Sequence, residues 1–147
     1  MTVPSEEVEV VLREAGWFPG RQVSVEAWKT QFASRGVHMH HAAERFLTEF
    51  GGLTVEVHGP GVTCAREPFE LNPSLCLGEE DRFAEWSAVV GSSIYPIGEM
   101  GDGRFFLGID EASIVYLVAD WIARYRPEVT TMESLVQGIA PEEISES

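Results

Sequence analysis

Apolar side chains recur every three or four positions through the first fifty residues, which is the period of an amphipathic helix. The pattern predicts three helices, over about residues 6–15, 25–35 and 40–50. Ser5 and Ser24 are placed to cap the first two helices, and glycines follow all three. The first third of the chain is therefore expected to be helical.

The period changes to two after residue 52, which indicates strands. A strand over residues 53–58 is followed by the turn HGPG and a return strand, VTCAR, over residues 62–66. Further along, residues 94–119 predict a three-stranded meander. Its turns are the Gly-Asp-Gly of residues 101–103 and the polar residues 110–113.

Two more helices are predicted over residues 79–91 and 131–137, and residues 67–78 are expected to be a connector that can contain short extended pieces. Helices, strands, a helix, strands and a helix do not alternate as in a parallel α/β protein. The sequence therefore predicts an α+β fold, with four to five helices packed on a mostly antiparallel sheet of about five to six strands. A single domain over residues 1–140 fits the length, and the acidic residues 141–147 are predicted to be a flexible tail.

The net charge of the chain limits the classes of molecule that it can bind. The chain has 24 acidic and 10 basic residues, a formal net charge of −14. Residues 1–75 hold ten acids and six bases, hence −4, whereas residues 76–147 hold fourteen acids and four bases, hence −10. Such a field repels nucleic acid and anionic membranes and attracts a basic protein. Solubility alone is the other explanation of the acidity.

The expected compartment is the cytoplasm. The N-terminal stretch MTVPSEEVEV has no apolar segment of signal-peptide length. No apolar run approaches the roughly 18 residues that span a bilayer. Two cysteines, Cys64 and Cys76, do not make a disulfide framework.

The sequence predicts no metal and no cofactor. His38, His40 and His41 lie close together, but no cysteine or glutamate is spaced to complete a zinc site, so surface or capping roles are expected. The Gly101–Gly103 turn has neither the ligand spacing of a calcium loop nor the third glycine of a dinucleotide-binding loop.

Catalytic motifs are also absent from the sequence. Neither cysteine lies in a redox or protease motif, and no G-x-S-x-G occurs. Adjacent acids in so acidic a chain are most simply a solvated face, although a cleft lined by tryptophans and carboxylates stays open as an enzymatic alternative. Trp17 and Trp121 fall outside the apolar stripes, which makes them candidates for exposed contact residues.

Four segments point to a family. REAGWFPGR, AAERFLTEFGGLTV, YPIGEMGDGRFFLGIDEASIVYLV and LVQG occur in this order over about residues 7–138. Together they resemble the third branch of the SUKH superfamily. That superfamily shares an α+β fold and consists mostly of bacterial immunity proteins, which bind and neutralise secreted polymorphic toxins. The resemblance implies this role and a toxin partner, and it implies no catalytic residue.

The resemblance also suggests what the acidity is for. Many toxins opposed by this superfamily are nucleases or deaminases, whose basic clefts hold nucleic acid. An acidic inhibitor would associate quickly with such a cleft and block it. The expected toxin-binding acids lie in the second half of the chain: Glu79, Glu80, Asp81, Glu85, Asp102, Asp110 and Glu111. An adaptor of the same fold that holds a basic cytoplasmic protein is the alternative, and whether the protein is a monomer or a dimer stays open.

Overall fold

The computed structural model describes residues 5–126 and 130–144. This part of the chain contains the α-helices α1 (Glu6–Glu14), α2 (Glu26–Ala33), α3 (His41–Phe50), α4 (Glu80–Val90) and α5 (Thr131–Gln137), and the short 3-10 helix η1 (Pro73–Cys76). Its strands are β1 (Thr54–Val55), β2 (Phe69–Glu70), β3 (Tyr95–Met100), β4 (Phe105–Ile109), β5 (Val115–Val118), β6 (Ile122–Arg124) and β7 (Glu142–Glu143). No helix among these is long and apolar enough to cross a membrane.

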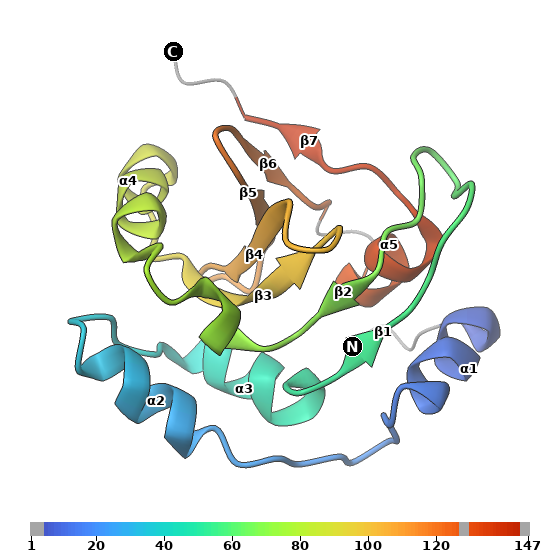
Figure 1. The fold of residues 1–147 in the computed structure, drawn as a ribbon, viewed down its shortest axis with the longest axis horizontal. Helices are drawn as coiled ribbons and strands as arrows, with labels where there is room; N and C mark the ends of the chain where they lie inside the picture. Colours follow the sequence, from blue (N-terminus) through green and yellow to red (C-terminus); the bar gives the residue numbers. More distant parts are fainter. Residues whose placement is uncertain (1–4, 127–129, 145–147) are drawn as a thin grey trace.

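The described strands form one sheet whose spatial order is the order of the sequence, β1 to β7 (Figure 1). Every pair of neighbouring strands is antiparallel. The prediction of an α+β fold is therefore confirmed, with slightly more strands than expected. The predicted meander over residues 94–119 forms as β3, β4 and β5.

Side-chain caps explain where two of the predicted helices begin. The Ser5 hydroxyl accepts a hydrogen bond from the Val8 N–H at 3.4 Å at the start of α1. Nδ1 of His40 accepts one from the Ala43 N–H at 3.2 Å at the start of α3. Since Nε2 of the same ring donates to the Ile109 carbonyl at 3.0 Å, His40 also ties α3 to β4. The expected capping role is confirmed for this histidine.

The predicted return strand over residues 62–66 is wrong. The N–H groups of Val62 and Thr63 donate to the carbonyls of Gln137 and Gly138, at 2.9 Å each, instead of to a neighbouring strand. These carbonyls belong to the end of α5 and would otherwise have no helical partner. These hydrogen bonds close the end of α5, and the segment forms an isolated bridge between Pro60 and Ala65 instead of a strand.

Three strands lie where the sequence pattern is weakest. β2 lies inside the predicted connector and pairs with both β1 and β3. β6 follows β5 after a short turn, and β7 comes from the predicted acidic tail and pairs with β6. Each of these strands has only two or three residues, so their existence depends on the neighbouring strand more than on their own sequence.

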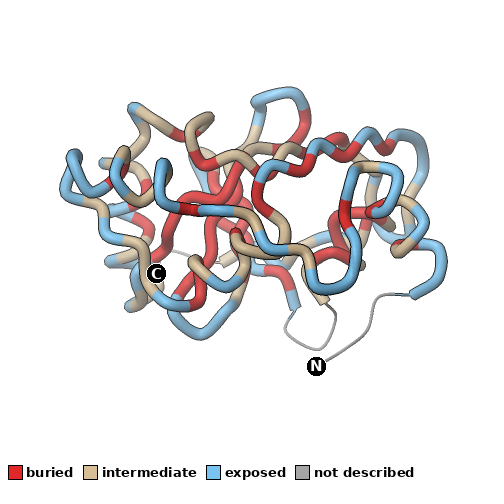
Figure 2. Tube along the Cα trace, turned by 90° about the horizontal axis from the view of Figure 1, so that it is seen from below, coloured by how far each residue is buried: buried red, intermediate tan, exposed pale blue. Residues whose placement is uncertain are grey.

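Helices pack on both faces of the sheet. Phe32 of α2 lies edge-on to Tyr95 of β3, with ring centroids 5.5 Å apart, and Phe83 of α4 lies 6.4 Å from Phe106 of β4. Tyr95 is paired with Ile109. Because residues 106 and 109 of one strand point to opposite faces, α2 and α4 contact opposite faces of the sheet. The buried segments run between these layers in Figure 2.

Candidate functional site

One row of directly paired residues crosses the sheet and changes from polar to apolar on the way. The row consists of Thr54, Glu70, Glu99, Phe106, Val118 and Ile122. Paired residues of antiparallel strands point to the same face, so all six side chains belong to the face that α4 contacts. Val118 and Ile122 are fully buried, whereas Thr54 is exposed and the two glutamates are partly exposed. Helix α4 therefore covers the apolar half of the row and leaves the polar half open.

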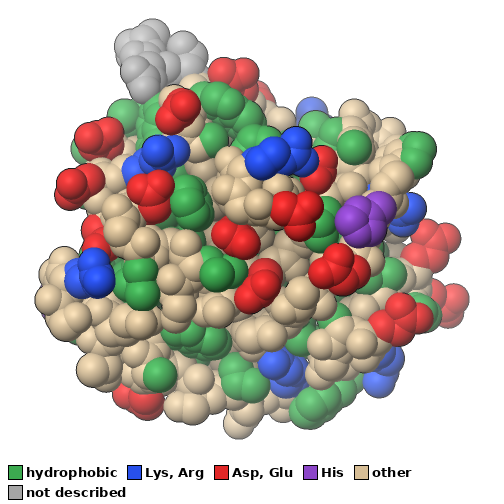
Figure 3. Space-filling model, in the orientation of Figure 1, with side chains coloured by type: hydrophobic (Ala, Val, Ile, Leu, Met, Phe, Trp, Pro, Cys, Tyr) green, Lys and Arg blue, Asp and Glu red, His purple; other side chains and the backbone are tan. Residues whose placement is uncertain are grey.

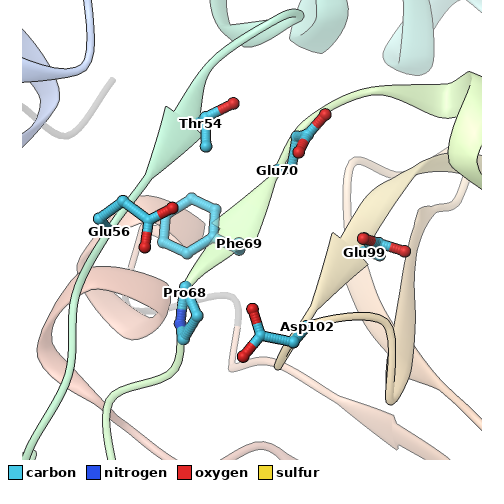
Figure 4. Close-up of a pocket in the computed structure, with 7 residues that line it drawn as sticks. All are labelled: Thr54, Glu56, Pro68, Phe69, Glu70, Glu99 and Asp102. Atoms are coloured by element: carbon cyan, nitrogen blue, oxygen red, sulfur yellow. The ribbon is translucent and has the colours of Figure 1, made fainter.

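The open half forms an acidic hollow of about 50 Å³. The residues that line this acidic hollow are Thr54, Glu56, Pro68, Phe69, Glu70, Glu99 and Asp102. Figure 4 shows Pro68 and Phe69 between Glu56 on one side and Glu99 and Asp102 on the other. Acidic side chains gather in the middle of the same face in Figure 3. A volume this small lies well below the roughly 300–1,000 Å³ of ordinary ligand pockets, so the hollow suits one side chain of a protein partner better than a substrate.

Backbone geometry brings these acids together. The pairing register between β3 and β4 shifts between Pro96 and Gly98, and a Cβ on Gly98 would lie 2.1 Å from the Glu70 carbonyl oxygen. Glycine thus allows β2 to approach β3 closely enough to set Glu70 opposite Glu99. The following turn is left-handed, with φ of 57° at Asp102, a conformation that aspartate tolerates better than most residues.

The carboxylates of the hollow repel one another. Glu70 and Glu99 are directly opposite across two strands, an arrangement that destabilises a sheet when the charges are alike. Within residues 5–126 and 130–144, Glu70, Glu99 and Asp102 make no ion pair, and Glu56 has only the exposed His58 at 3.6 Å. Burial, and then the charges of Glu70 and Asp102, raise the pKa of Glu99. A cation placed in the hollow would relieve this repulsion.

The acids of α4 are in a different state. Asp81 and Glu85 are exposed, one turn apart on the helix. Glu79 lies 3.7 Å from Arg82, and Glu80 lies 2.9 Å from Arg35. Half of the predicted α4 acids are therefore already paired with arginine.

The pKa of Glu80 reflects this pairing. Burial alone would raise the pKa, but hydrogen bonds from Arg35 and from backbone N–H groups, together with the charge of Arg35, lower it below the usual value. Glu80 is therefore stabilised in its charged form inside the protein.

Glu80 and Glu111 line one open groove beside α4. The groove has a volume of about 610 Å³, and Ala84 and Ala88 of the helix form part of its wall. His38 lines it from the segment between α2 and α3. Two of the sequence-predicted acids thus line this groove, which shares no lining residue with the acidic hollow.

Asp110 is buried and holds the β4–β5 turn. Its side chain is almost fully covered, with 3% exposed. One carboxylate oxygen accepts hydrogen bonds from the N–H groups of Ala112 and Ile114, at 2.8 and 3.0 Å, and the other accepts one from the Tyr116 hydroxyl at 2.9 Å. Asp110 therefore faces the protein interior and does not contribute to the acidic surface.

Of the seven acids expected from the sequence, only Asp102 lines the acidic hollow. The residues that sequence reasoning missed are Glu56, Glu70 and Glu99. Glu56 lay on the polar side of an alternating strand, which is a usable signal. Glu70 and Glu99 gave none, because each is a single acid in an apolar stretch and becomes significant only when β2 pairs with β3.

The two tryptophans that the sequence offered as exposed contacts differ. Trp17 is buried: its ring stacks on Phe50 with centroids 6.5 Å apart, and its N–H donates to Glu49 at 3.1 Å. The prediction for Trp17 is therefore wrong, because the chain folds back on α3 after α1. Trp121, in the turn between β5 and β6, is 40% exposed, as predicted.

The histidines form no metal site in the described part of the chain. His40 is used as the cap of α3, and His38 and His41 are exposed. No group of three His, Cys, Asp or Glu side chains there is arranged to hold a metal ion.

Comparison with known proteins agrees with this description. Searches among curated proteins and among solved structures found no match. A family model described as SUKH-3 immunity protein matches residues 4–137, which is nearly the whole chain. The chain therefore belongs to the SUKH-3 family of immunity proteins.

Proposed function

We propose that the protein neutralises a cognate toxin by binding a basic surface of the toxin domain in a one-to-one complex. The acidic hollow is the centre of the proposed interface. Its open position on the sheet, and the lack of ion-pair partners for Glu70, Glu99 and Asp102 among the described residues, carry the proposal. Family membership supports the role, and the net charge of −14 supports the sign of the partner.

A toxin that acts on nucleic acid is the class that this charge suits best. A nuclease or a deaminase must present cationic groups to hold phosphates. An inhibitor with unpaired carboxylates competes for the same groups and associates rapidly by electrostatic attraction. Inhibition then follows from occupation of the cleft and requires no reaction.

The proposed interface includes acids from both parts of the chain. Glu56, Glu70, Glu99 and Asp102 line the hollow. Asp81 and Glu85 of α4 are exposed and extend the negative field toward the partner. Glu79, Glu80 and Glu111 contribute less, since arginines neutralise the first two and the third lies across the groove.

The test begins with capture of partners on the immobilised protein at low and at high ionic strength. The captured toxin domain is then expressed with and without this protein, and complex formation is measured by calorimetry. We expect restored growth, a one-to-one complex and weaker binding at high salt. Undiminished toxicity, or binding that ignores salt, would contradict the proposal. Capture of a resident basic protein in place of a toxin would favour the adaptor role.

A further inference from the structure

Two turns at one end of the sheet bring an aromatic pair to the surface. Phe105 begins β4 directly after the turn that carries Asp102, and Trp121 precedes β6. Their ring centroids are 5.9 Å apart, with an angle of 59° between the planes. We call Arg104, Phe105, Asp120 and Trp121 the aromatic tip. Its first two residues belong to the same β3–β4 hairpin as Asp102, which lines the acidic hollow.

Trp121 differs from the other three tryptophans of the chain. Trp17, Trp28 and Trp86 donate their indole N–H groups to Glu49, Asn72 and the Ala119 carbonyl, at 3.1, 3.3 and 3.2 Å. The N–H of Trp121 has no acceptor in the part of the chain that the structure describes, and the side chain is 40% exposed. A large ring that keeps a free donor at the surface is typical of a contact residue in protein interfaces.

The aromatic tip already shows how a guanidinium fits here. Arg104 lies over the ring of Phe105, 5.4 Å from its centroid, and pairs with Glu67 at 2.6 Å. An aromatic face and a carboxylate together thus hold one arginine within the protein itself.

Trp121 and Asp120 repeat this combination at a more exposed position. The Asp120 side chain pairs with Arg82 of α4 at 3.5 Å but stays 95% exposed, so a second guanidinium can reach its carboxylate. A planar cation could lie on the exposed indole and reach this carboxylate. Arginine suits such a site better than lysine, because the guanidinium both stacks and forms paired hydrogen bonds.

We propose that Trp121 and Asp120 bind an arginine side chain of the basic partner, at the same end of the sheet as the turn that carries Asp102. The identity of that partner as a toxin rests on the proposed function; the chemistry of the contact does not. The net charge of the molecule favours a cationic partner.

Hexa-arginine and hexa-lysine peptides are the probes, and the indole N–H signals in NMR spectra of the labelled protein are the readout. The Trp121 signal is assigned from its loss in Trp121→Phe. We expect hexa-arginine to shift this signal more than the other three indole signals, and more than hexa-lysine does. Trp121→Ala should weaken hexa-arginine binding about threefold or more, as expected for loss of a cation–π contact at the surface.

Phe18→Ala is the matched control, because Phe18 is also exposed, at 52%, and lies in the segment between α1 and α2. Thermal unfolding of each variant shows whether it is folded. If Trp121→Ala is not folded, Trp121→Phe replaces it in the binding test, because it retains a ring beside Phe105. An unmoved Trp121 signal, equal binding by the alanine variants of Trp121 and Phe18, or no binding of hexa-arginine would each overturn the proposal.

These outcomes are independent of the toxin test. If the protein captures and neutralises a toxin but Trp121→Ala changes neither peptide binding nor the toxin complex, the arginine contact is refuted and the proposed function stands. If the peptide results are as expected but no toxin is neutralised, the arginine contact stands and the toxin role is refuted.

Discussion

The acidic hollow and the groove beside α4 are both lined by carboxylates. Among the described residues, Glu70 and Glu99 of the hollow have no arginine partner, whereas Glu80 of the groove has one. In the hollow, Glu70 and Glu99 oppose each other and the pKa of Glu99 is raised, first by burial and then by the neighbouring acids. In the groove, Arg35 pairs with Glu80, whose pKa is lowered. Acidic residues are therefore not equivalent as binding sites: those already neutralised stabilise the fold, and those left unpaired can attract a partner.

The largest effect is expected at the turn that borders the groove. Asp110→Ala leaves the N–H groups of Ala112 and Ile114 and the buried Tyr116 hydroxyl without their acceptor, so the free energy of unfolding should fall by about 2–3 kcal/mol. Tyr116→Phe removes one of these bonds and should cost about 1 kcal/mol. Urea unfolding measures both. A loss below about 0.5 kcal/mol for Asp110→Ala would show that the carboxylate does not hold this turn.

The acidic hollow and α4 should also differ in how much they contribute to the rate of association with the partner. We expect Glu70→Gln combined with Glu99→Gln to slow association with the captured toxin domain by about tenfold at low salt. Asp81→Asn combined with Glu85→Gln removes the same charge from α4 and should slow it only about two- to threefold. Stopped-flow association rates at several salt concentrations provide the measurement. Equal effects of the two double variants would mean that net charge, and not the hollow, steers the partner.

Two single substitutions that each remove a negative charge should change the free energy of unfolding in opposite directions. Glu99→Gln removes the repulsion from Glu70 and should stabilise the free protein by about 0.5 kcal/mol. Glu80→Gln removes an ion pair with Arg35 and should destabilise it by a similar amount, about 0.5 kcal/mol. Chemical unfolding of both variants at neutral pH measures these two changes. Destabilisation by Glu99→Gln would contradict the strained arrangement of the hollow.

The smallest effect concerns pH. Folding raises the pKa of Glu99. Its contribution to the free energy of unfolding is therefore complete below the pKa of the unfolded chain, about 4.3, and is lost as pH rises through the pKa of the folded protein. Because folding lowers the pKa of Glu80, its contribution is present above that value and is lost as pH falls through the folded pKa. Unfolding of the wild type beside Glu99→Gln and Glu80→Gln across acidic pH should show these opposite slopes; slopes of one sign would refute the contrast.

Much of the fold could be predicted because its signals are local. The caps at Ser5 and His40 act within four residues, and the two strands around residues 105–118 are apolar enough to be buried in any sheet. The strand expected over residues 62–66 failed for a nonlocal reason. Its N–H groups meet the end of α5, more than 70 residues away in the sequence.

The candidate site could be predicted only in part. Asp102 was expected because it lies in the Gly-Asp-Gly turn of the predicted meander, and Trp121 because it lies outside the apolar stripes. Asp110 carries the same charge in a similar turn, yet its oxygens are used by the backbone and by Tyr116. Sequence alone does not distinguish these two aspartates, since the difference depends on which groups the folded chain brings beside each.

The sequence by itself determined the α+β class, the approximate positions of the helices, the family and the sign of the charge, because each depends on composition or on residues close together in the chain. Only the tertiary structure decided which carboxylates act together. β2 pairs with β3 and brings Glu70 opposite Glu99, 29 positions further along the chain, while α4 covers the apolar half of the same row. Electrostatic coupling depends on distance in space, and strand pairing rather than sequence proximity sets that distance.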